Sequence, residues 1–352
     1  MTAKRAAKKI LTNGLLALAS FTIVFALGEF LLRLRYAEAP RTPTEEVLAI
    51  QRHLKLHPKI GFTWNANVLP EDNVVLTVSD VDFAPLSTGA YGFINSPQAI
   101  KERGLGRAVD IIGLGDSFME LAAHEFHRYF DANGFAYYGL AMHRQAPPQY
   151  TAILKEYALP LQPDWIVYGL FENDFEETQD FQNWERSGLD WFSFHSGTWC
   201  GPSLATSSLF RFKDKHLRGL SGLTHVLHSR IRGERMSVMG PSAPSIQAVQ
   251  DEIESAFKVT RESRADFLLV LIPSRATVTQ GPTAESEAYD ELLEADDLSE
   301  IPVLDLRELF LEQDDPANLY YEIDAHWNAN GIALAAEAIL NAIQQGEETE
   351  AP

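Results

Sequence analysis

From residue 107 onward, short apolar runs alternate five times with segments of helical spacing. This alternation is typical of a parallel sheet with helices on both faces, because parallel strands are joined by crossover helices. We therefore predict an α/β domain over residues 107–345, a doubly wound, flavodoxin-like three-layer sandwich with a five-stranded parallel sheet. The predicted strands cover residues 108–114, 135–140, 165–171, 267–272 and 303–306, and the predicted helices cover 118–133, 148–159, 246–264 and 330–343.

The segments outside this alternation have other compositions. Residues 37–106 begin with a stretch rich in Pro and charge up to residue 60, which predicts a stalk, and continue as a β-rich lead-in. Residues 176–245 predict a long irregular insertion within the α/β domain. The acidic residues 346–352 predict a disordered tail.

The N-terminal 36 residues predict a membrane anchor. Residues 10–28 form a run of 19 residues without a charge, preceded by four basic residues. A helix of roughly 20 residues crosses a bilayer, and basic residues before it hold the N-terminus in the cytoplasm. We expect a single-pass protein whose remaining chain lies in the periplasm or otherwise outside the cytoplasm. Two alternatives stay open: a signal peptide cleaved near Gly28, and a buried core helix.

Charge and cysteine content exclude several classes of partner and site. The chain of 352 residues carries a net charge of −20, and beyond residue 36 it has 23 basic against 48 acidic residues. Nucleic-acid binding depends on clustered Lys and Arg, so this acidic composition makes a nucleic-acid partner a poor expectation. Cys200 is the single cysteine, which rules out an intramolecular disulfide or a cysteine-based metal site. We expect neither a metal nor an organic cofactor.

Chemically complementary residues follow three of the predicted strands. Ser117 follows the first strand, Asn173 the third, and Asp324 and His326 lie beyond the fifth. In doubly wound sheets, ligands bind at the carboxyl ends of the strands. A serine hydroxyl becomes a nucleophile when an imidazole takes its proton, and a carboxylate orients that imidazole. The Asn173 amide and the Ser117 N–H are candidate donors to an oxyanion.

These motifs resemble those of the SGNH hydrolases, also called the GDSL family of esterases and lipases. The resemblance covers roughly residues 107–345 and includes the Gly-Asp-Ser-Phe segment at 115–118, Asn173-Asp174 and the Asp-Ala-His segment at 324–326. It implies that Ser117 is the nucleophile, His326 the general base, Asp324 its orienting acid and Asn173 an oxyanion donor.

Two departures from the family pattern affect the prediction. The family places a glycine after the second strand, whose N–H completes the oxyanion hole; here that position falls near Arg144. The acid and base are spaced Asp-x-His rather than Asp-x-x-His. The Asp-x-His-Trp segment at 324–327 is similar to a signature of the alginate O-acetylation enzymes, although there it precedes the serine.

The resemblance implies a membrane-anchored serine esterase that removes O-acyl groups, acetyl above all, from a glycan or related ester. One alternative is an O-acyltransferase that modifies a cell-envelope or exported polysaccharide with the same residues. It would need a membrane partner that supplies acyl groups. A second alternative is a non-catalytic, tethered glycan-binding protein.

Some residues also admit other interpretations. Gly113 and Gly115 resemble the start of a dinucleotide fingerprint, but Phe118 occupies the place of its third glycine. His124, on the same helical face as Ser117, competes as base, although no carboxylate is placed to orient it. Asp116 and Asp174 are expected to cap turns rather than bind a metal. The aromatic residues of the insertion predict either the small core of a lid or a sugar-stacking platform: Trp184, Trp191, Phe192, Phe194 and Trp199.

Overall fold

The computed structural model describes residues 53–195 and 243–350, apart from 73–74, 79–80, 296–297 and 323, and in addition residues 13 and 20. From residue 53 onward, these residues belong to one compact unit, Ala49–Ser196 with Met239–Pro352. None of the helices in the described ranges has the length and apolar character needed to span a bilayer. The predicted anchor at residues 10–28 lies outside those ranges except at positions 13 and 20.

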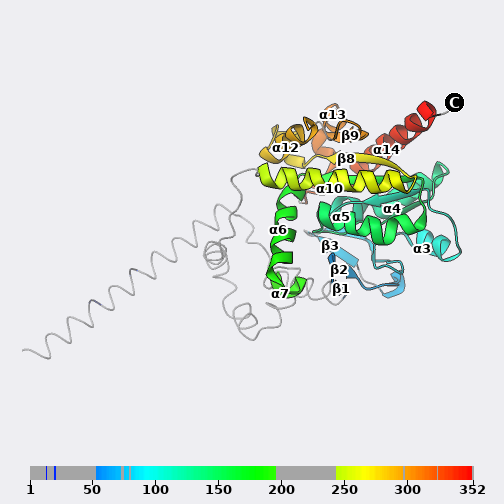
Figure 1. Ribbon diagram of the computed structural model, residues 1–352, viewed down its shortest axis with the longest axis horizontal. Coiled ribbons are helices and arrows are strands. Elements are labelled where there is room, and N and C mark those ends of the chain that lie inside the picture. The colour runs from blue at the N-terminus through cyan, green and yellow to red at the C-terminus, as the bar shows by residue number, and fades with distance from the viewer. Residues whose placement is uncertain are drawn as a thin grey trace, which may run out of the picture. The chain divides into compact units, whose positions relative to one another are not determined.

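A five-stranded parallel sheet forms the centre of this unit (Figure 1), which confirms the predicted fold class. The strand order β6-β5-β7-β8-β9 is that of a flavodoxin-like sheet, because the chain passes from the first strand to one neighbour and then to the other side. After the exposed Asp266, the sequence of β8, FLLVLI, is a continuous apolar and buried run, as expected for a strand covered on both faces. The strands are β5 (Ile111–Leu114), β6 (Tyr137–Gly139), β7 (Trp165–Phe171), β8 (Asp266–Ile272) and β9 (Val303–Asp305).

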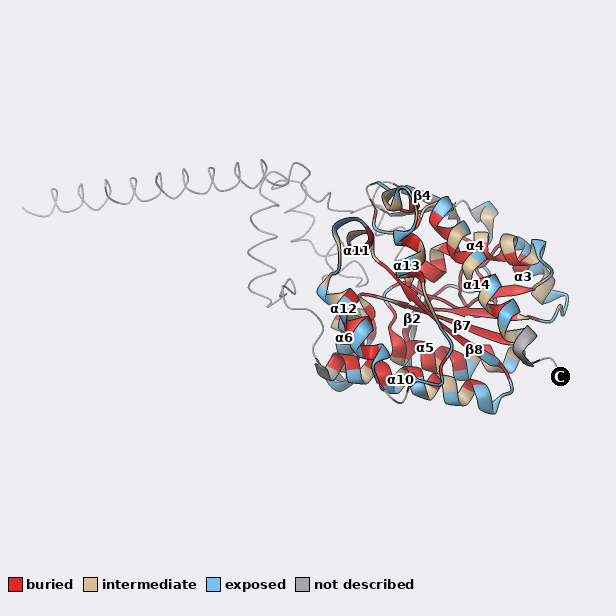
Figure 2. Ribbon diagram, turned by 90° about the horizontal axis from the view of Figure 1, so that it is seen from above, coloured by how far each residue is buried: buried red, intermediate tan, exposed pale blue. Residues whose placement is uncertain are grey.

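Helices cover both faces of the sheet (Figure 2). One face is covered by α4 (Ser117–Ala132), α13 (Leu306–Leu311) and α14 (Ala329–Glu350), the other by α5 (Pro147–Ile153) and α10 (Ala243–Glu262). Within residues 53–195 and 243–350, the other helices are α3 (Pro97–Gly104), α6 (Asp174–Ser187), α7 (Trp191–Phe194), α11 (Arg275–Gln280) and α12 (Ala284–Leu293), with a π-helical turn at Leu154–Ala158 and 3-10 turns at Pro70–Asp72, Leu159–Leu161 and Pro316–Leu319.

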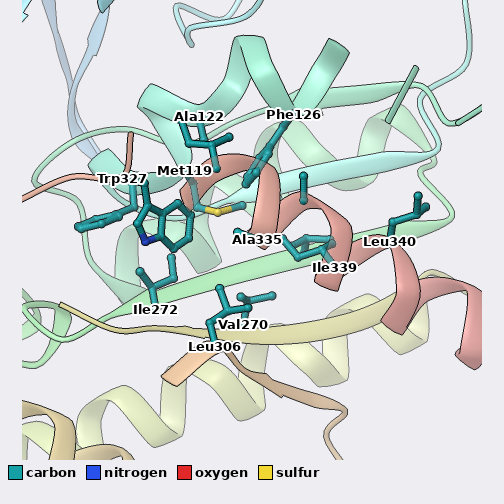
Figure 3. Packing of buried hydrophobic residues seen from close by; sticks show 14 of the residues in the cluster. Met119, Ala122, Phe126, Val270, Ile272, Leu306, Trp327, Ala335, Ile339 and Leu340 are labelled. Atoms are coloured by element: carbon teal, nitrogen blue, oxygen red, sulfur yellow. The ribbon is translucent and has the colours of Figure 1, made fainter. Parts of the chain in front are cut away.

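The largest part of the core lies between the sheet and the α4/α14 layer (Figure 3). Phe126 of α4 and Ile339 of α14 are almost fully buried, and Val270 of β8 lies on the sheet beneath them. Replacing a buried Phe such as Phe126 by Ala costs about 3–5 kcal/mol of folding free energy. This packing holds α4, and with it the residue at its first position, Ser117, rigidly against the sheet.

Two antiparallel hairpins precede the sheet, as the predicted β-rich lead-in. The first joins β1 (Leu54–His57) to β2 (Gly61–Trp64), and the second joins β3 (Val75–Val78) to β4 (Val81–Pro85). The predicted stalk is wrong for residues 53–60, which form β1 and its turn and bury Ile60. Leu54 and Ile60 of this short segment are buried in the folded unit, whereas Leu56 is exposed; residues 37–52 lie outside the described ranges.

Two further expectations need correction. The start of the insertion at 176–245 is regular, because α6 and α7 occupy most of residues 174–194; residues 196–242 are outside the described part of the chain. The tail is helical as far as Glu350, since α14 continues through residues predicted to be disordered. Glu and Gln are good helix formers, and they extend a helix that packing has already nucleated.

Candidate active site

Three side chains predicted to act together form a hydrogen-bonded relay. Nε2 of His326 lies 2.7 Å from Oγ of Ser117. Nδ1 of His326 lies 2.5 Å from Oδ1 of Asp324, which also accepts the backbone N–H of His326 at 2.9 Å. The carboxylate therefore holds the proton on Nδ1 and leaves Nε2 as the acceptor of the serine proton. The Asp324 side chain is 5% exposed and that of His326 is 17% exposed.

The turn between β5 and α4 presents Ser117. Asp116 caps α4 by accepting the backbone N–H of Phe118 at 2.9 Å, as its predicted capping role requires. Gly115 has φ +151°, and a Cβ there would lie 2.5 Å from Cγ of Met119 and 3.1 Å from the carbonyl oxygen of Gly169. The turn is therefore tight enough to require glycine, and it points the serine away from the sheet at the start of a helix.

The loop that carries Asp324 and His326 is closed on itself. The backbone N–H of Tyr321 donates to the carbonyl of His326 at 3.1 Å, and Tyr320 pairs with Trp327 in an antiparallel bridge. Nη1 of Arg275 donates to the carbonyl of Glu322 at 2.6 Å. The acid and base are thus positioned by backbone contacts within one short loop.

Aromatic packing supports the imidazole of His326. The ring of Phe118 lies 4.9 Å from the ring of His326 and 5.2 Å from that of Trp327, between centroids. Trp327 is 2% exposed and contacts Phe310 on its other side. Sequence analysis missed this support, although Phe118 and Trp327 each directly follow a predicted catalytic residue.

The two other predicted oxyanion residues flank Ser117. Because β5 lies between β6 and β7, the segments after these three strands meet at one edge of the sheet. Asn173 follows β7 as the N-cap of α6, and its Oδ1 is buried with no hydrogen bond to the described residues. Arg144 follows β6. The structure joins Ser117, His326 and Asp324 by hydrogen bonds and places Asn173 and Arg144 on neighbouring strand ends.

Arg144 occupies a backbone conformation that favours glycine. Its φ is +55°, and it is the third residue of a turn closed by the N–H of Gln145 donating to the carbonyl of Met142. Turns with a positive φ at this position usually carry Gly or Asn. The conformation therefore agrees with the alignment of Arg144 with the family glycine. The Arg144 side chain is exposed, and its neighbours His143 and Gln145 are buried.

Three buried carboxyl groups lie behind these loops. Burial raises the pKa of Asp116 to about 6, although the nearby His326 opposes the shift. Burial, reinforced by the charge of Asp116, raises the pKa of Asp174 well above its ordinary value. Burial raises the pKa of Glu177 to about 8 against the opposing charge of Arg144. Low dielectric and mutual repulsion therefore favour the neutral forms of these groups.

Asp174 has the turn-stabilising role predicted for it. Its Oδ2 accepts the backbone N–H of Phe171 at 2.9 Å, and its Oδ1 accepts the hydroxyl of Tyr150 at 2.8 Å. Glu172, the residue directly after β7, accepts hydrogen bonds from the backbone N–H of Ser274 and the hydroxyl of Thr277. The carboxyl groups of Asp174 and Glu172 therefore tie β7 to neighbouring segments.

His124 lies away from the relay. Its Nε2 is 3.3 Å from Oγ of Ser87 in the lead-in, and burial lowers the pKa of its imidazole. No carboxylate orients it toward Ser117 in the described part of the chain. His124 therefore links α4 to the lead-in and is not part of the relay.

One group of side chains among the described residues has the spacing of metal ligands: Glu102, His127 and Asp131. Nη1 of Arg107 lies 2.5 Å from the Glu102 carboxylate and 2.8 Å from that of Asp131. The Arg107 guanidinium thus already pairs with both carboxylates. Arg107 also precedes β5, at the end of the strand opposite to Ser117.

Aromatic residues of α6 and α7 form a small core. Trp184 and Trp191 are buried, and their rings lie 5.2 Å apart in an edge-on arrangement. Trp191 also covers Phe62 and lies so close to Gly61 that a Cβ there would be 2.5 Å from its ring. This packing favours the lid-core interpretation over a sugar platform. Phe192 and Phe194 are half-buried, and Trp199 and Cys200 lie outside the described residues.

A further buried network, missed by the sequence analysis, links α4 to the turn after β6. Glu120 lies three residues after Ser117 and is 1% exposed. It accepts hydrogen bonds from Trp64 of β2 and from His143. The available signal was a single acidic residue among apolar ones on the inner face of the predicted helix.

Comparison with known proteins identifies the type of site. Residues 234–352 match the model of the SGNH hydrolase-like domain of the acetyltransferase AlgX, and the match includes Asp324 and His326. This confirms the predicted resemblance to the SGNH hydrolases. Together with the relay, it identifies an enzyme that cleaves or transfers ester-linked acyl groups, an esterase or an O-acyltransferase.

Several solved structures are similar at low identity. A GDSL-like lipase from Bacteroides thetaiotaomicron has 12% identity and a TM-score of 0.42, with 71% of this chain and 97% of that chain covered. A lipase/acylhydrolase from Enterococcus faecalis has 12% identity and a TM-score of 0.41, covering 67% and 96%. An acetylxylan esterase from Geobacillus stearothermophilus has 12% identity and a TM-score of 0.38, covering 67% and 95%. No curated protein matches the chain.

Proposed function

We propose that this protein is a serine esterase that removes O-acetyl groups from a glycan through an acyl-enzyme at Ser117. The observation that carries the proposal is the continuous relay from Asp324 through His326 to the Ser117 hydroxyl. A serine, a histidine and a carboxylate in this geometry are the requirements of nucleophilic ester cleavage.

In the proposed mechanism, Oγ of Ser117 attacks the ester carbonyl while Nε2 of His326 takes its proton. Asp324 stabilises the imidazolium that results. The backbone N–H groups of Ser117 and Arg144 and the Asn173 amide donate hydrogen bonds to the oxyanion. The tetrahedral intermediate then collapses, and His326 gives the proton to the leaving alkoxide oxygen, which becomes a hydroxyl of the glycan. Water then cleaves the acyl-enzyme in a second, equivalent step.

A second candidate is O-acetyl transfer to a polysaccharide hydroxyl in place of water. The similarity of residues 234–352 to a domain of the acetyltransferase AlgX favours it. Both candidates form the same acyl-enzyme and differ only in the acceptor. The buried aromatic cluster around Trp184 and Trp191 supports a lid that shields the site from water. A purely glycan-binding protein would have no need of an intact relay.

The location proposed for this chemistry is the outer side of the cytoplasmic membrane. The uncharged residues 10–28 and the four basic residues before them support an N-terminal anchor. An anchor of this kind would suit a transferase that receives acyl groups from a membrane partner. The net charge of −20 argues against a nucleic-acid substrate.

Burst kinetics distinguish these functions. The full-length protein in detergent is mixed with a chromogenic acetyl ester, with and without a polysaccharide acceptor, beside the variant Ser117→Ala. A burst followed by steady turnover in water indicates an esterase. A burst that stalls until the acceptor is added indicates a transferase. Equal rates for the wild type and Ser117→Ala would contradict both.

A further inference from the structure

The turn of residues 142–145 needs an external support for its conformation. Arg144 lies in the left-handed region, which is strained for a residue other than glycine. Such residues keep their conformation only where the surroundings determine it. The N–H of Arg144 is also the group assigned to the oxyanion, so its direction decides whether it can donate there. We call residues 142–145 the oxyanion turn.

Glu120 supplies this support from the helix that carries the nucleophile. Its Oε2 accepts two hydrogen bonds from His143, one from the backbone N–H at 3.0 Å and one from Nδ1 at 2.8 Å. These bonds fix the residue directly before Arg144. Because Ser117 and Glu120 share the first turn of α4, one rigid element sets both the hydroxyl and the oxyanion turn.

The lead-in hairpin completes the support. Nε1 of Trp64 in β2 donates to Oε1 of Glu120 at 2.6 Å. The rings of Trp64 and Phe62 each lie 5.1 Å from the ring of His143. The buried Glu120 carboxylate thus accepts hydrogen bonds from Trp64 and His143, and aromatic rings pack against His143, a setting in which losing a partner is costly.

The residue after Arg144 is held from the same hairpin. Nε2 of Gln145 donates to the carbonyl of Phe62 at 3.1 Å, and the Gln145 carbonyl accepts the hydroxyl of Tyr150 at 2.7 Å. Gln149 donates to the carbonyl of Ile60 at 2.8 Å. Both neighbours of Arg144 are therefore fixed by buried contacts while Arg144 itself faces solvent.

We propose that Glu120 is a positioning residue that, with Trp64 of the lead-in hairpin, holds the oxyanion turn in its catalytic conformation. The inference rests on the proposed function and adds to it, since it makes the lead-in part of the catalytic apparatus. Glu120 acts through His143 and Arg144 and does not touch the substrate.

The test compares Glu120→Gln with the wild type in the full-length protein. The amide of Gln turns a donor toward either Trp64 or His143, so one hydrogen bond becomes a repulsive contact. Misplacement of an oxyanion donor lowers kcat by about 10²-fold, and we expect a loss of this order with little change in KM. Ser117→Ala is the reference for the proposed function.

A thionoester provides a readout that a purely structural defect would not change. Sulfur accepts weaker hydrogen bonds than oxygen, so an ordered oxyanion hole favours the oxygen ester over the thionoester. We expect Glu120→Gln to lose part of this preference. Trp64→Phe keeps the aromatic packing, removes one donor, and should show a smaller change in the same direction; it also serves if Glu120→Gln does not fold.

The outcomes separate the two proposals. Wild-type kcat in folded Glu120→Gln, or a lower kcat with the wild-type oxygen-to-sulfur preference, would overturn the positioning role. An unchanged kcat together with an unchanged oxygen-to-sulfur preference in Trp64→Phe would also overturn the positioning role. Ester turnover that survives Ser117→Ala would instead contradict the proposed function itself.

Discussion

Two hydrogen-bonded carboxylate–histidine pairs lie beside the first turn of α4, and they differ in what surrounds the imidazole. Asp324 and His326 lie 2.5 Å apart, and the second ring nitrogen reaches the hydroxyl of Ser117. Glu120 and His143 lie 2.8 Å apart, and their ring is enclosed by aromatic side chains of the lead-in. The His326 side chain is 17% exposed and that of His143 is 7% exposed.

The comparison shows that the pair itself does not determine the role. In both pairs the carboxylate fixes the proton on Nδ1. In the first pair, a nucleophile at Nε2 and access to solvent make the imidazole a base. In the second pair, the imidazole is buried and Glu120 also accepts the backbone N–H of His143, so the pair links α4 to the turn after β6.

Replacing the acid of the exposed pair tests this distinction with the largest effect. Asp324→Asn leaves the loop geometry in place but favours the wrong tautomer of His326. We expect kcat to fall about 10³–10⁴-fold, as tautomer reversal does in other serine enzymes. The measurement is steady-state hydrolysis of the acetyl ester. Activity within tenfold of wild type would assign the base elsewhere and remove the contrast between the pairs.

A third carboxyl group, that of Glu177 near Arg144, is expected to affect the pH dependence of folding stability rather than catalysis. The pKa of Glu177 is raised from 4.5 to about 8, so the folded protein holds a proton that the unfolded chain loses above pH 4.5. The free energy of unfolding therefore falls as pH rises from 4.5 to 8 and stays reduced above that. The full effect is on the order of several kcal/mol.

Glu177→Gln removes this titration. Urea unfolding of both proteins between pH 5 and 9 should show the variant gaining stability relative to the wild type as pH increases. Parallel stability curves across this range would contradict the raised pKa.

The oxyanion turn offers a test with a small expected effect. Arg144→Gly keeps the N–H and removes the strain of a positive φ, while it adds conformational entropy to the unfolded chain. The two terms are each about 1 kcal/mol and opposite in sign, so the stability should change little. Ester hydrolysis should remain close to wild type. A large loss of kcat would show that the guanidinium, rather than the backbone, acts in the reaction.

His124 provides the smallest expected change. His124→Gln should leave kcat unchanged and lower stability by about 1 kcal/mol at most, because it weakens one contact with Ser87. Activity and thermal unfolding measured together check this. A loss of activity comparable to that of Asp324→Asn would show that His124 belongs to the reacting groups.

The sequence predicted the elements that local pattern determines. The strand at Trp165–Phe171 has the predicted bounds, and the polar residues after the strands meet at one sheet edge. The relay was predictable because each member follows a strand and the chemistry needs all three. The resemblance to the SGNH hydrolases supplied the roles.

What the sequence did not predict depends on contacts between distant segments. Trp64 and Glu120 are 56 residues apart, and nothing in the local pattern of either predicts their hydrogen bond. Ile60 lies in the predicted stalk and Trp191 in the predicted irregular insertion, yet both are buried against other segments of the folded unit. Burial of this kind is a property of the tertiary structure and has no local signature.

The most direct test of the central claim is to find the acyl group on Ser117. The protein is mixed with the chromogenic acetyl ester, quenched with acid during the burst, and examined by intact-mass measurement and peptide mapping. The account predicts one added acetyl group, located on Ser117 and absent from Ser117→Ala. A burst whose label lies on another residue, or turnover without any acyl-enzyme on Ser117 when the quench is rapid, would contradict it.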